Sequence, residues 1–457
     1  MILLLTLLGE VSLSGSNEMH LWLEQPGWKT QFCNEANADL YVDAFRVGGR
    51  FLLDAEKLRD TLTRIELTQR YLEYSGERFS LTLGNYYTTL GYGLALSSFE
   101  DKAMRIDRNL DGGKFSWQKN WLSLGALAGR MLKPDKENRD EWLYGADVSV
   151  TPLENLKIEG IYLRRDATTD ADTLFGRAWE EWAEENVDFG FWRFNLGLAS
   201  AQRFVWGRYS PKGWIGVDSV NGFGFFATLS YAQEGIGVLL EGKSYKGLAG
   251  GINAPPPANP DGESINEGAD EQGFRANLNL APWPWLFVDA GYALAWDSSR
   301  TSKVSRTGLD TRLDIAGHTF NPFFTLIDRE LPGGGGSSTS PQNDQLEAGL
   351  GYETLIWEIS AHFKGSWRIV TEAAEKWNEP HLLLELGWGP WMLAGGGVVV
   401  LSDSTEVWPW GSIRYNAYPF DLTLSYGRFK GEYICKNGIC SYELPFNGLK
   451  ADVTLYF

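Results

Sequence analysis

The sequence lacks long apolar runs and has few cysteines, histidines and basic residues. No apolar run reaches the length of about 18 residues that a membrane-spanning helix needs, so a helical membrane protein is disfavoured. The chain has 41 basic and 59 acidic residues and a net charge of −18. Nucleic acid needs a basic surface, so it is not an expected partner. Much of the acid lies in expected loops such as Glu180–Glu185, and only charges that line a lumen would set the selectivity of a pore.

Groups for catalysis or for holding a cofactor are equally scarce. The four histidines are His20, His318, His362 and His381, and no spacing between them matches a metal motif or a catalytic triad. The sequence also lacks a Cys-x-x-Cys-His haem-attachment motif. Serine and aspartate are common in the expected loops, but no arrangement stands out. We therefore predict no enzymatic activity, no metal site and no cofactor.

The chain has three cysteines, and two of them flank a tight-turn signal. Cys435 and Cys440 enclose Asn437-Gly438, a dipeptide typical of two-residue hairpin turns. Such a pair can form a disulfide across a hairpin in an oxidising compartment. A metal clip is the alternative, but no histidine lies nearby and two ligands do not make a site. We predict a Cys435–Cys440 disulfide, which leaves Cys33 over.

The abundant residues are glycine and aromatics, with 52 Gly, 20 Trp, 19 Tyr and 24 Phe in 457 residues. This composition suits a barrel with a polar lumen and aromatic girdles on its outer face. The last ten residues, Gly448–Phe457, alternate apolar and polar side chains, and this length matches a tilted strand that crosses a bilayer. The segment resembles the closing strand of bacterial outer-membrane barrels. In those proteins the terminal phenylalanine is part of the signal read by the assembly machinery, so the resemblance implies that role for Phe457.

The rest of the chain repeats one unit: a strand, a short turn with Pro, Gly or aromatics, a second strand and a long polar loop. We predict one antiparallel transmembrane β-barrel of roughly 18–24 strands, about 22 as the best value, with short periplasmic turns and long extracellular loops. A soluble sandwich or solenoid is the alternative. Residues 10–457 form the predicted barrel, and residues 1–9 are interpreted as a remnant of an export signal. The predicted long loops include Asp166–Glu185, Lys246–Gln272 and Val370–Pro380.

The N-terminal quarter, Ser12–Trp117, has a sequence pattern that differs from the rest of the chain. It contains Gly84-Asn85-Tyr86, then Gly91-Tyr92-Gly93, and then Glu100, Ile106 and Asp107. Through this pattern the chain resembles an uncharacterised family of large outer-membrane barrel proteins of Gram-negative bacteria. The resemblance implies a barrel fold and an outer-membrane location. The family has no settled activity to carry over.

A charged stretch within residues 99–114 is too polar to face lipid. A solvated extracellular loop held by ion pairs is the commoner outcome for such a stretch, and a loop that folds into the lumen and constricts it is the alternative. In the barrel wall, polar side chains that alternate with apolar ones are predicted to face the lumen. The candidate pore-lining residues are Glu100, Asp101, Lys102, Arg105, Asp107, Arg108, Asp111, His362, Lys364, Arg368 and Asp421.

The leading functional hypothesis is a porin-like channel of the bacterial outer membrane that passes small polar solutes. One alternative is a polysaccharide exporter, although such exporters favour an electropositive lumen for anionic chains, which this acidic sequence does not indicate. Another is a structural or docking barrel whose extracellular loops bind a partner. The expected partners are outer-membrane lipid, the assembly machinery and small polar solutes, and oligomerisation stays open.

Overall fold

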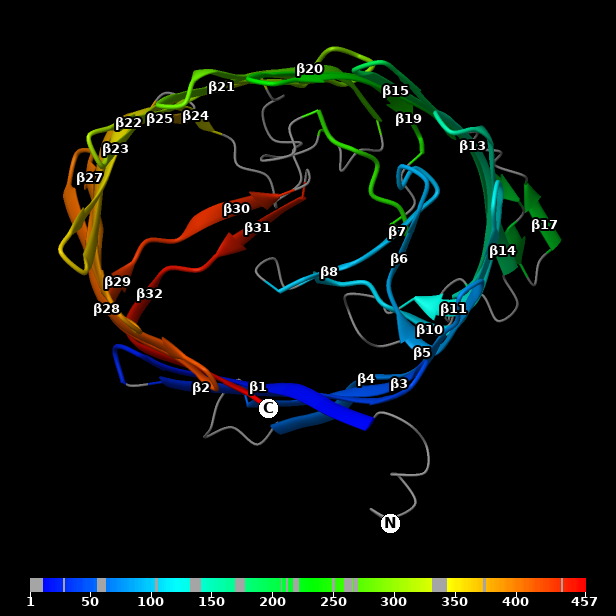
Figure 1. Cartoon of the computed structure of the whole chain (residues 1–457), viewed down its shortest axis with the longest axis horizontal. Coiled ribbons are helices and arrows are strands. Elements are labelled where there is room, and N and C mark those ends of the chain that lie inside the picture. The colour runs from blue at the N-terminus through cyan, green and yellow to red at the C-terminus, as the bar shows by residue number, and fades with distance from the viewer. Residues whose placement is uncertain are drawn as a thin grey trace.

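A closed antiparallel β-barrel of 24 strands forms the body of the protein in this computed structural model (Figure 1). The structure describes residues 11–27, 29–55, 63–102, 106–131, 141–168, 177–206, 208–210, 213–216, 222–248, 251–258, 265, 270–330, 343–372, 375–436 and 439–457. The segment interpreted as an export signal, residues 1–9, lies outside this part of the chain. No helix in the described ranges is long and apolar enough to span a membrane.

The wall strands follow one another around the barrel almost in sequence order. They are β1 (Val11–Glu24), β2 (Lys29–Val42), β3 (Phe45–Ala55), β4 (Thr63–Ser75), β5 (Phe79–Tyr86), β10 (Leu110–Lys119), β11 (Leu122–Met131), β12 (Trp142–Leu153), β13 (Leu156–Thr168), β14 (Arg177–Phe191), β15 (Phe194–Trp206), β18 (Gly222–Gln233), β19 (Ile236–Lys246), β20 (Asp270–Trp283), β21 (Leu286–Trp296), β22 (Lys303–Ile315), β23 (His318–Glu330), β24 (Asn343–Ile356), β25 (Ile359–Glu372), β26 (Glu375–Trp388), β27 (Trp391–Leu401), β28 (Thr405–Ala417), β29 (Phe420–Phe429) and β32 (Phe446–Tyr456).

The barrel closes where β1 pairs with β32, which leaves no open edge along the seam. The seam ends on two backbone hydrogen bonds between Gly15 and Phe457, with N–O distances of 2.8 and 3.1 Å. A side chain at residue 15 would clash with the Phe457 ring, because its Cβ would lie 2.5 Å from the ring atom Cζ. Gly15 therefore makes room for the terminal aromatic residue.

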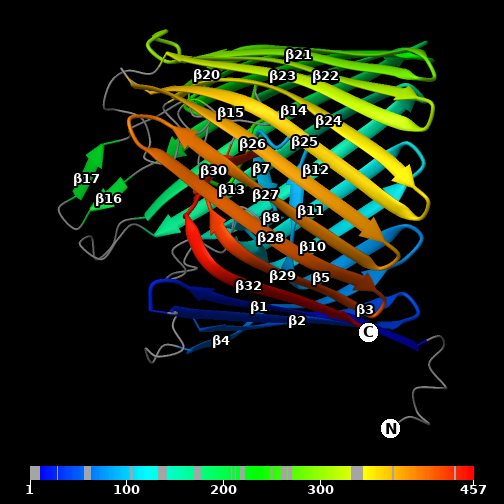
Figure 2. The same ribbon diagram turned by 90° about the vertical axis from the view of Figure 1, so that its left-hand side faces the viewer.

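Short turns gather at one end of the barrel and longer connections at the other (Figure 2). Several short turns begin with a residue in the left-handed backbone conformation, which suits tight hairpins between right-twisted strands. These residues are Asp43, Asn120, Trp192, Ala316 and Trp357, with φ between 50° and 56°.

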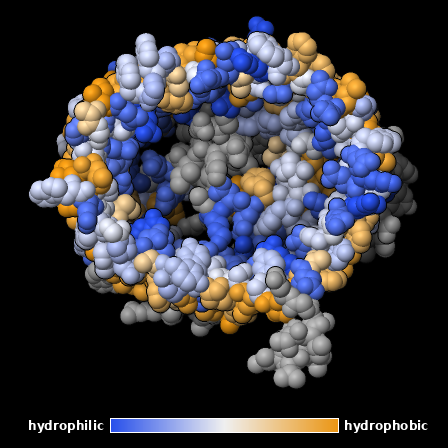
Figure 3. All heavy atoms as spheres, in the orientation of Figure 1, coloured by the Kyte–Doolittle hydropathy of each residue, from blue (hydrophilic) through white to orange (hydrophobic). Residues whose placement is uncertain are grey.

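The two faces of the wall differ as the period-two pattern predicts. On β29, Phe420, Leu422 and Leu424 are exposed on the outside, with exposed fractions of 40–49%. Figure 3 shows apolar residues around the outer rim of the barrel and hydrophilic residues around its inner rim. This apolar belt and the closed wall confirm the predicted transmembrane β-barrel.

The 24 strands lie within the predicted range of 18–24 and above the best value of 22. One detail of the prediction is wrong. Much of the predicted loop Asp166–Glu185 is strand, since β13 runs to Thr168 and β14 begins at Arg177, and β25 and β26 likewise cover most of Val370–Pro380. The charged residues there serve as cross-strand partners, as in the ion pair between Arg165 and Glu180 at 2.6 Å, so polarity did not mark a loop.

Four small hairpin strand pairs lie outside the wall order. They are β6 (Thr88–Leu90) with β7 (Leu96–Ser98), β8 (Glu100–Asp101) with β9 (Ile106–Asp107), β16 (Arg208–Ser210) with β17 (Gly213–Gly216), and β30 (Glu432–Lys436) with β31 (Ile439–Glu443). Strands β6–β8 and the β30–β31 hairpin lie inside the ring of wall strands, whereas β16 and β17 lie outside it (Figure 1).

Candidate functional site

Residues 87–109, here called the lumenal segment, leave the wall after β5 and return to it at β10. Tyr86 and Leu110, the last and first residues of these strands, are direct partners in the β5–β10 register. The wall therefore runs on as if the segment were absent. The segment is an insertion into the lumen and not an interruption of the barrel (Figure 1).

The base of the lumenal segment is tied together by Gly84 and Asn85. Gly84 has a φ of +100°, and a Cβ there would lie 2.1 Å from the carbonyl oxygen of Arg70. The Asn85 side chain accepts the backbone N–H of Arg70 at 2.8 Å and donates to the Asn109 side chain at 2.8 Å. Asn85 thus joins the wall, the entry and the exit of the segment through one amide group.

The β6–β7 hairpin packs against the inner face of the wall from β11 to β19 through a buried apolar cluster. Tyr92 from the hairpin and Phe226 from β18 form a tilted aromatic pair with a centroid distance of 5.2 Å. Burial of the apolar side chains in this cluster stabilises the hairpin against the wall. The buried members of the cluster are Tyr86, Leu90, Leu94, Ala95, Leu96, Leu110, Leu127, Met131, Leu143, Ile161, Leu163, Trp182, Ala199, Ala201, Phe226, Tyr245, Leu248 and Ile252.

A buried carboxylate accepts hydrogen bonds from the tip of the hairpin. Glu184 of β14 is 1% exposed, and its two oxygens accept the backbone N–H groups of Tyr92 at 2.9 Å and Ala95 at 2.8 Å. The Tyr92 phenol donates a hydrogen bond to Asp188. Burial, together with that carboxylate, raises the pKa of Tyr92, so the phenol stays protonated and remains a donor.

Two glycines allow this close approach. Gly91 has a φ of +52°, and a Cβ there would lie 2.3 Å from Oε1 of Glu184. On the wall, a Cβ at Gly197 would lie 2.1 Å from the Tyr92 hydroxyl. The Gly91-Tyr92-Gly93 motif is therefore the part of the chain that docks on the inner wall.

The charged stretch docks on a different part of the wall. The Lys102 amine lies 2.9 Å from Glu18 on β1 and 2.8 Å from Glu35 on β2. Glu18 and Glu35 are direct cross-strand partners, and their like charges would repel without a cation between them. Glu100 accepts two hydrogen bonds from Arg50 on β3, one of them at 3.0 Å. Desolvation by burial lowers the pKa of Lys102, but the hydrogen bonds to Glu35 and Glu18 outweigh this effect, so the pKa is raised overall.

The other predicted residues of the stretch play local roles. Asp107 accepts the Tyr87 phenol at 2.8 Å, and Arg108 lies over the Phe99 ring at 5.6 Å. Asp101 follows Glu100 on β8. Asp111 belongs to β10 and lies 3.7 Å from Arg70. Arg105 lies outside the described residues.

The predicted wall residues are spread over β25 and β29 and do not gather with the lumenal segment. His362 Nδ1 lies 2.7 Å from Glu385, Lys364 lies 4.6 Å from the centroid of the Phe323 ring, and Arg414 donates to Asp421 at 2.9 Å. Arg368 donates to Glu347 at 3.1 Å. Arg368 and Asp421 thus belong to pairs of opposite charge on the wall.

Buried Glu379 on β26 links the wall to the connection that carries the β30–β31 hairpin. It lies 3.7 Å from Arg368 and also pairs with Lys430, which precedes β30. Cys435 and Cys440 face each other in the β30–β31 register. Their side chains lie outside the described residues, so the disulfide stays a prediction, while Cys33 is free.

Residues 251–258 form a second inward element that the sequence did not reveal. Asn253 donates to the carbonyl of Leu94 at 2.7 Å, and Ser97 donates its backbone N–H to Ile252 at 3.0 Å. This element therefore packs on the lumenal segment. One sequence feature could have revealed these inner elements. Leu143, Leu163 and Trp182 stand at inward positions of the wall strands, where a water-filled lumen would favour polar residues.

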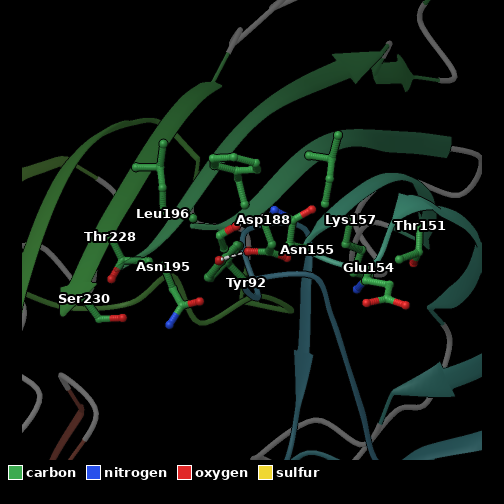
Figure 4. A pocket seen from close by; sticks show the side chains of 14 residues that line it. Tyr92, Thr151, Glu154, Asn155, Lys157, Asp188, Asn195, Leu196, Thr228 and Ser230 are labelled. Carbon is green, nitrogen blue, oxygen red and sulfur yellow. Dashed lines mark hydrogen bonds between the residues drawn. The ribbon is translucent and has the colours of Figure 1, made fainter. Parts of the chain in front are cut away.

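A cavity of about 450 Å³ lies beside the hairpin tip, near the end of the barrel with the short turns. Asn195, Ser230 and Glu154 point to one side of the sheet and Leu196 to the other (Figure 4). The cavity is lined by Tyr92, Thr151, Glu154, Asn155, Leu156, Lys157, Asp188, Phe189, Gly190, Asn195, Leu196, Gly197, Thr228 and Ser230. No cluster of metal-ligating side chains occurs among the residues that the structure describes.

Comparison with solved structures agrees with the barrel fold. The translocation pore of the P pilus usher PapC is 9% identical, with 97% of this chain and 99% of that chain covered and a TM-score of 0.53. The siderophore receptor PirA from Pseudomonas aeruginosa is 10% identical, with coverages of 98% and 81% and a TM-score of 0.49. The outer membrane protein OpdK from the same organism is 9% identical, with coverages of 71% and 95% and a TM-score of 0.42. At this identity, the likeness to the usher pore shows a shared fold and nothing of activity.

The molecule is thus a transmembrane β-barrel with a docked inner segment. Residues 24–251 match the model of a family of unknown function (DUF6029). The predicted resemblance to an uncharacterised family is confirmed, and the matched part extends well beyond Trp117. It contains the lumenal segment and the strands β11–β19 that receive its hairpin. No curated protein matches the sequence.

Proposed function

We propose that the protein is an outer-membrane channel for small polar solutes whose wide barrel is narrowed by the lumenal segment. The observation that carries this proposal is the docking of one inserted segment at two places on the inner wall. The β6–β7 hairpin is held by Glu184, and the β8–β9 stretch is held by Glu18, Glu35 and Arg50. A segment held at two places is suited to set a fixed aperture.

Barrel geometry supports the need for such a segment. The diameter of a barrel grows with strand number, and a wall of 24 strands is wider than the 16–18 strands of general porins. An empty barrel of this size would pass solutes with little selection. Paired charges along the remaining wall, such as Arg368 with Glu347, suit the passage of hydrated polar solutes.

Conductance measurements on the purified barrel test the proposal. The protein is reconstituted in a planar bilayer, and single-channel currents are recorded under a salt gradient. We expect stable current steps. Lys102→Glu places a third acid beside Glu18 and Glu35 and should release the charged stretch, so the conductance and the cation preference both rise.

The matched control is Lys303→Glu. Lys303 forms an exposed pair with Glu330 at 3.0 Å on β22 and β23, away from the lumenal segment. The same change of charge there should leave the single-channel conductance unaltered. Silence from a correctly folded barrel would refute the channel and favour a plugged barrel that docks a partner through its loops.

A further inference from the structure

The cavity beside Tyr92 has the form of a binding site built jointly by the wall and the lumenal segment. Its volume of about 450 Å³ lies within the range of roughly 300–1,000 Å³ that holds small ligands. The turn residues Glu154 and Asn155 and the strand residue Gly190 are among its lining residues. A solute at the short-turn mouth of the barrel would therefore meet this cavity on entry.

The cavity combines neutral hydrogen-bonding groups with excess negative charge. Thr228, Ser230 and Asn195 supply two hydroxyls and a side-chain amide. These groups can both donate to and accept from a solute.

Three charged side chains line the cavity. Glu154 and Asp188 are acidic, and Lys157 is basic. The Lys157 amine lies 3.3 Å from Glu159, so a wall carboxylate balances its charge. The local field therefore favours a cation.

The position of Asp188 is fixed by the docked segment. Its Oδ1 accepts the Tyr92 phenol, and Tyr92 lies over Gly197 and against Phe226. The segment thus places a fixed carboxylate at the edge of a polar cavity. A preorganised carboxylate of this kind binds an ammonium group with less loss of side-chain freedom than a mobile one.

We propose that this cavity is a solute-binding subsite for small hydroxylated amines, with Asp188 as the partner of the ammonium group and Asn195, Thr228 and Ser230 as partners of the hydroxyls. The inference rests on the proposed channel function and names its solute class. Among solutes of equal size and shape, the subsite should therefore select by charge. The site discriminates between solutes at the short-turn mouth and not at the loop end.

Three probes with one ring and different charges test the site: glucosamine, glucose and glucuronate. Each is added to the short-turn side of a conducting bilayer, and the block of single-channel current is titrated. We expect glucosamine to block at a concentration about tenfold below that for glucose, which corresponds to about 1.4 kcal/mol. Glucuronate should block least.

Two variants separate the charge from the architecture. Asp188→Asn keeps an oxygen that can accept the Tyr92 phenol but removes the charge, so the preference for glucosamine should fall about tenfold. Tyr92→Phe removes the phenol that fixes Asp188 and keeps its carboxylate, so glucosamine should bind more weakly while the order of the three probes stays the same. Asp289→Asn is the matched control, because Asp289 is a wall residue on β21 whose cross-strand partner is Asp310, and it is not among the cavity residues. It should leave the order of the probes unchanged.

Ligand-observed NMR on the detergent-solubilised protein measures the same preference without current. Conduction without a glucosamine preference, or with one that survives Asp188→Asn, would overturn the subsite and leave the channel intact. A silent barrel that still binds glucosamine through Asp188 would keep the subsite and remove the channel. Neither current nor preferential binding would overturn both.

Discussion

At the scale of single residues, the N-terminal motif is explained by docking inside the barrel. Gly84 and Asn85 form the base of the lumenal segment, and Gly91 and Tyr92 meet the wall at its tip. Glu100 pairs with Arg50. The motif and the charged stretch can be recognised in the sequence, but their partners lie on strands far away in the chain. A single sequence gives no information about that distance, so Arg50, Glu184 and Asp188 were missed.

Charge pairing also changes the picture of the lumen. Acids and bases on opposite sides of a constriction would create an electric field across the lumen. Lys102 instead sits between Glu18 and Glu35, and its charge is used to hold the segment. Opposite charges at hydrogen-bond distance cancel most of their far field. The proposed selectivity therefore rests on the aperture and on the Asp188 subsite, and not on a field across the lumen.

Gly91→Ala tests the docking of the hairpin tip. An alanine at φ +52° costs about 1–2 kcal/mol in the left-handed conformation, and its Cβ would also push against Glu184. We expect the backbone amides of Tyr92 and Ala95 to lose protection against hydrogen exchange, because they would lose the carboxylate that accepts them.

The matched control for this change is Gly317→Ala. Gly317 has a φ of +83° with nothing within 4 Å of a built Cβ, so it carries the same kind of backbone strain without a clash. Protection at Tyr92 and Ala95 should be unchanged in this control. Equal protection in both variants would show that the tip is not held by the contact of Gly91 with the wall.

At the scale of elements, hydrophobic alternation predicted the wall strands well and the inner elements poorly. The C-terminal strand and β29 follow a clean period of two, and their register with each other matches it. On β12 the pattern fails because Leu143, between exposed Trp142 and Tyr144, is buried under the lumenal segment. Alternation reports lipid on one side and water on the other, so it cannot distinguish an apolar inner wall from an irregular strand.

The β30–β31 hairpin carries the predicted disulfide. Cys435 and Cys440 are directly opposed in its register, and opposed cysteines that flank a tight turn can be bridged. We expect mass spectrometry after alkylation in denaturant without reductant to find only Cys33 modified. Reductant should then expose both remaining thiols. Cys33→Ser is the control, since it should leave no alkylated site before reduction. Alkylation of Cys435 without reductant would contradict the pairing.

At the scale of the whole molecule, the count of strands was predictable only in part. Eighteen wall strands follow Trp121 and six precede it, so the total lies at the upper end of the predicted range of 18–24. The strands β6–β9 pair only with each other and add nothing to the wall, which alternation in the sequence does not reveal. The family match over residues 24–251 covers the lumenal segment together with the strands β11–β19 that receive its hairpin.

The wall strands β5 and β10 pair directly with each other, so the wall does not depend on the lumenal segment between them. Because Tyr86 and Leu110 are direct partners, a two-residue Asn-Gly turn can replace residues 87–109 and close β5 onto β10 without a change of register. The wall keeps every strand pair, so the shortened chain should still form a barrel that resists SDS until heated. Its inner face would expose Leu127, Leu143 and Leu163 to water, which costs stability but breaks no backbone ladder.

The shortened barrel should conduct several-fold more current than the full chain. A stricter test is the passage of larger neutral solutes, measured by liposome swelling with sugars of increasing size, because the widest solute admitted reports the aperture directly. If the full and shortened proteins admit the same solutes, the lumenal segment does not set the aperture, and its two anchors serve only to stabilise the barrel. If the shortened protein admits larger solutes while Lys303→Glu in the full chain does not, the aperture belongs to residues 87–109.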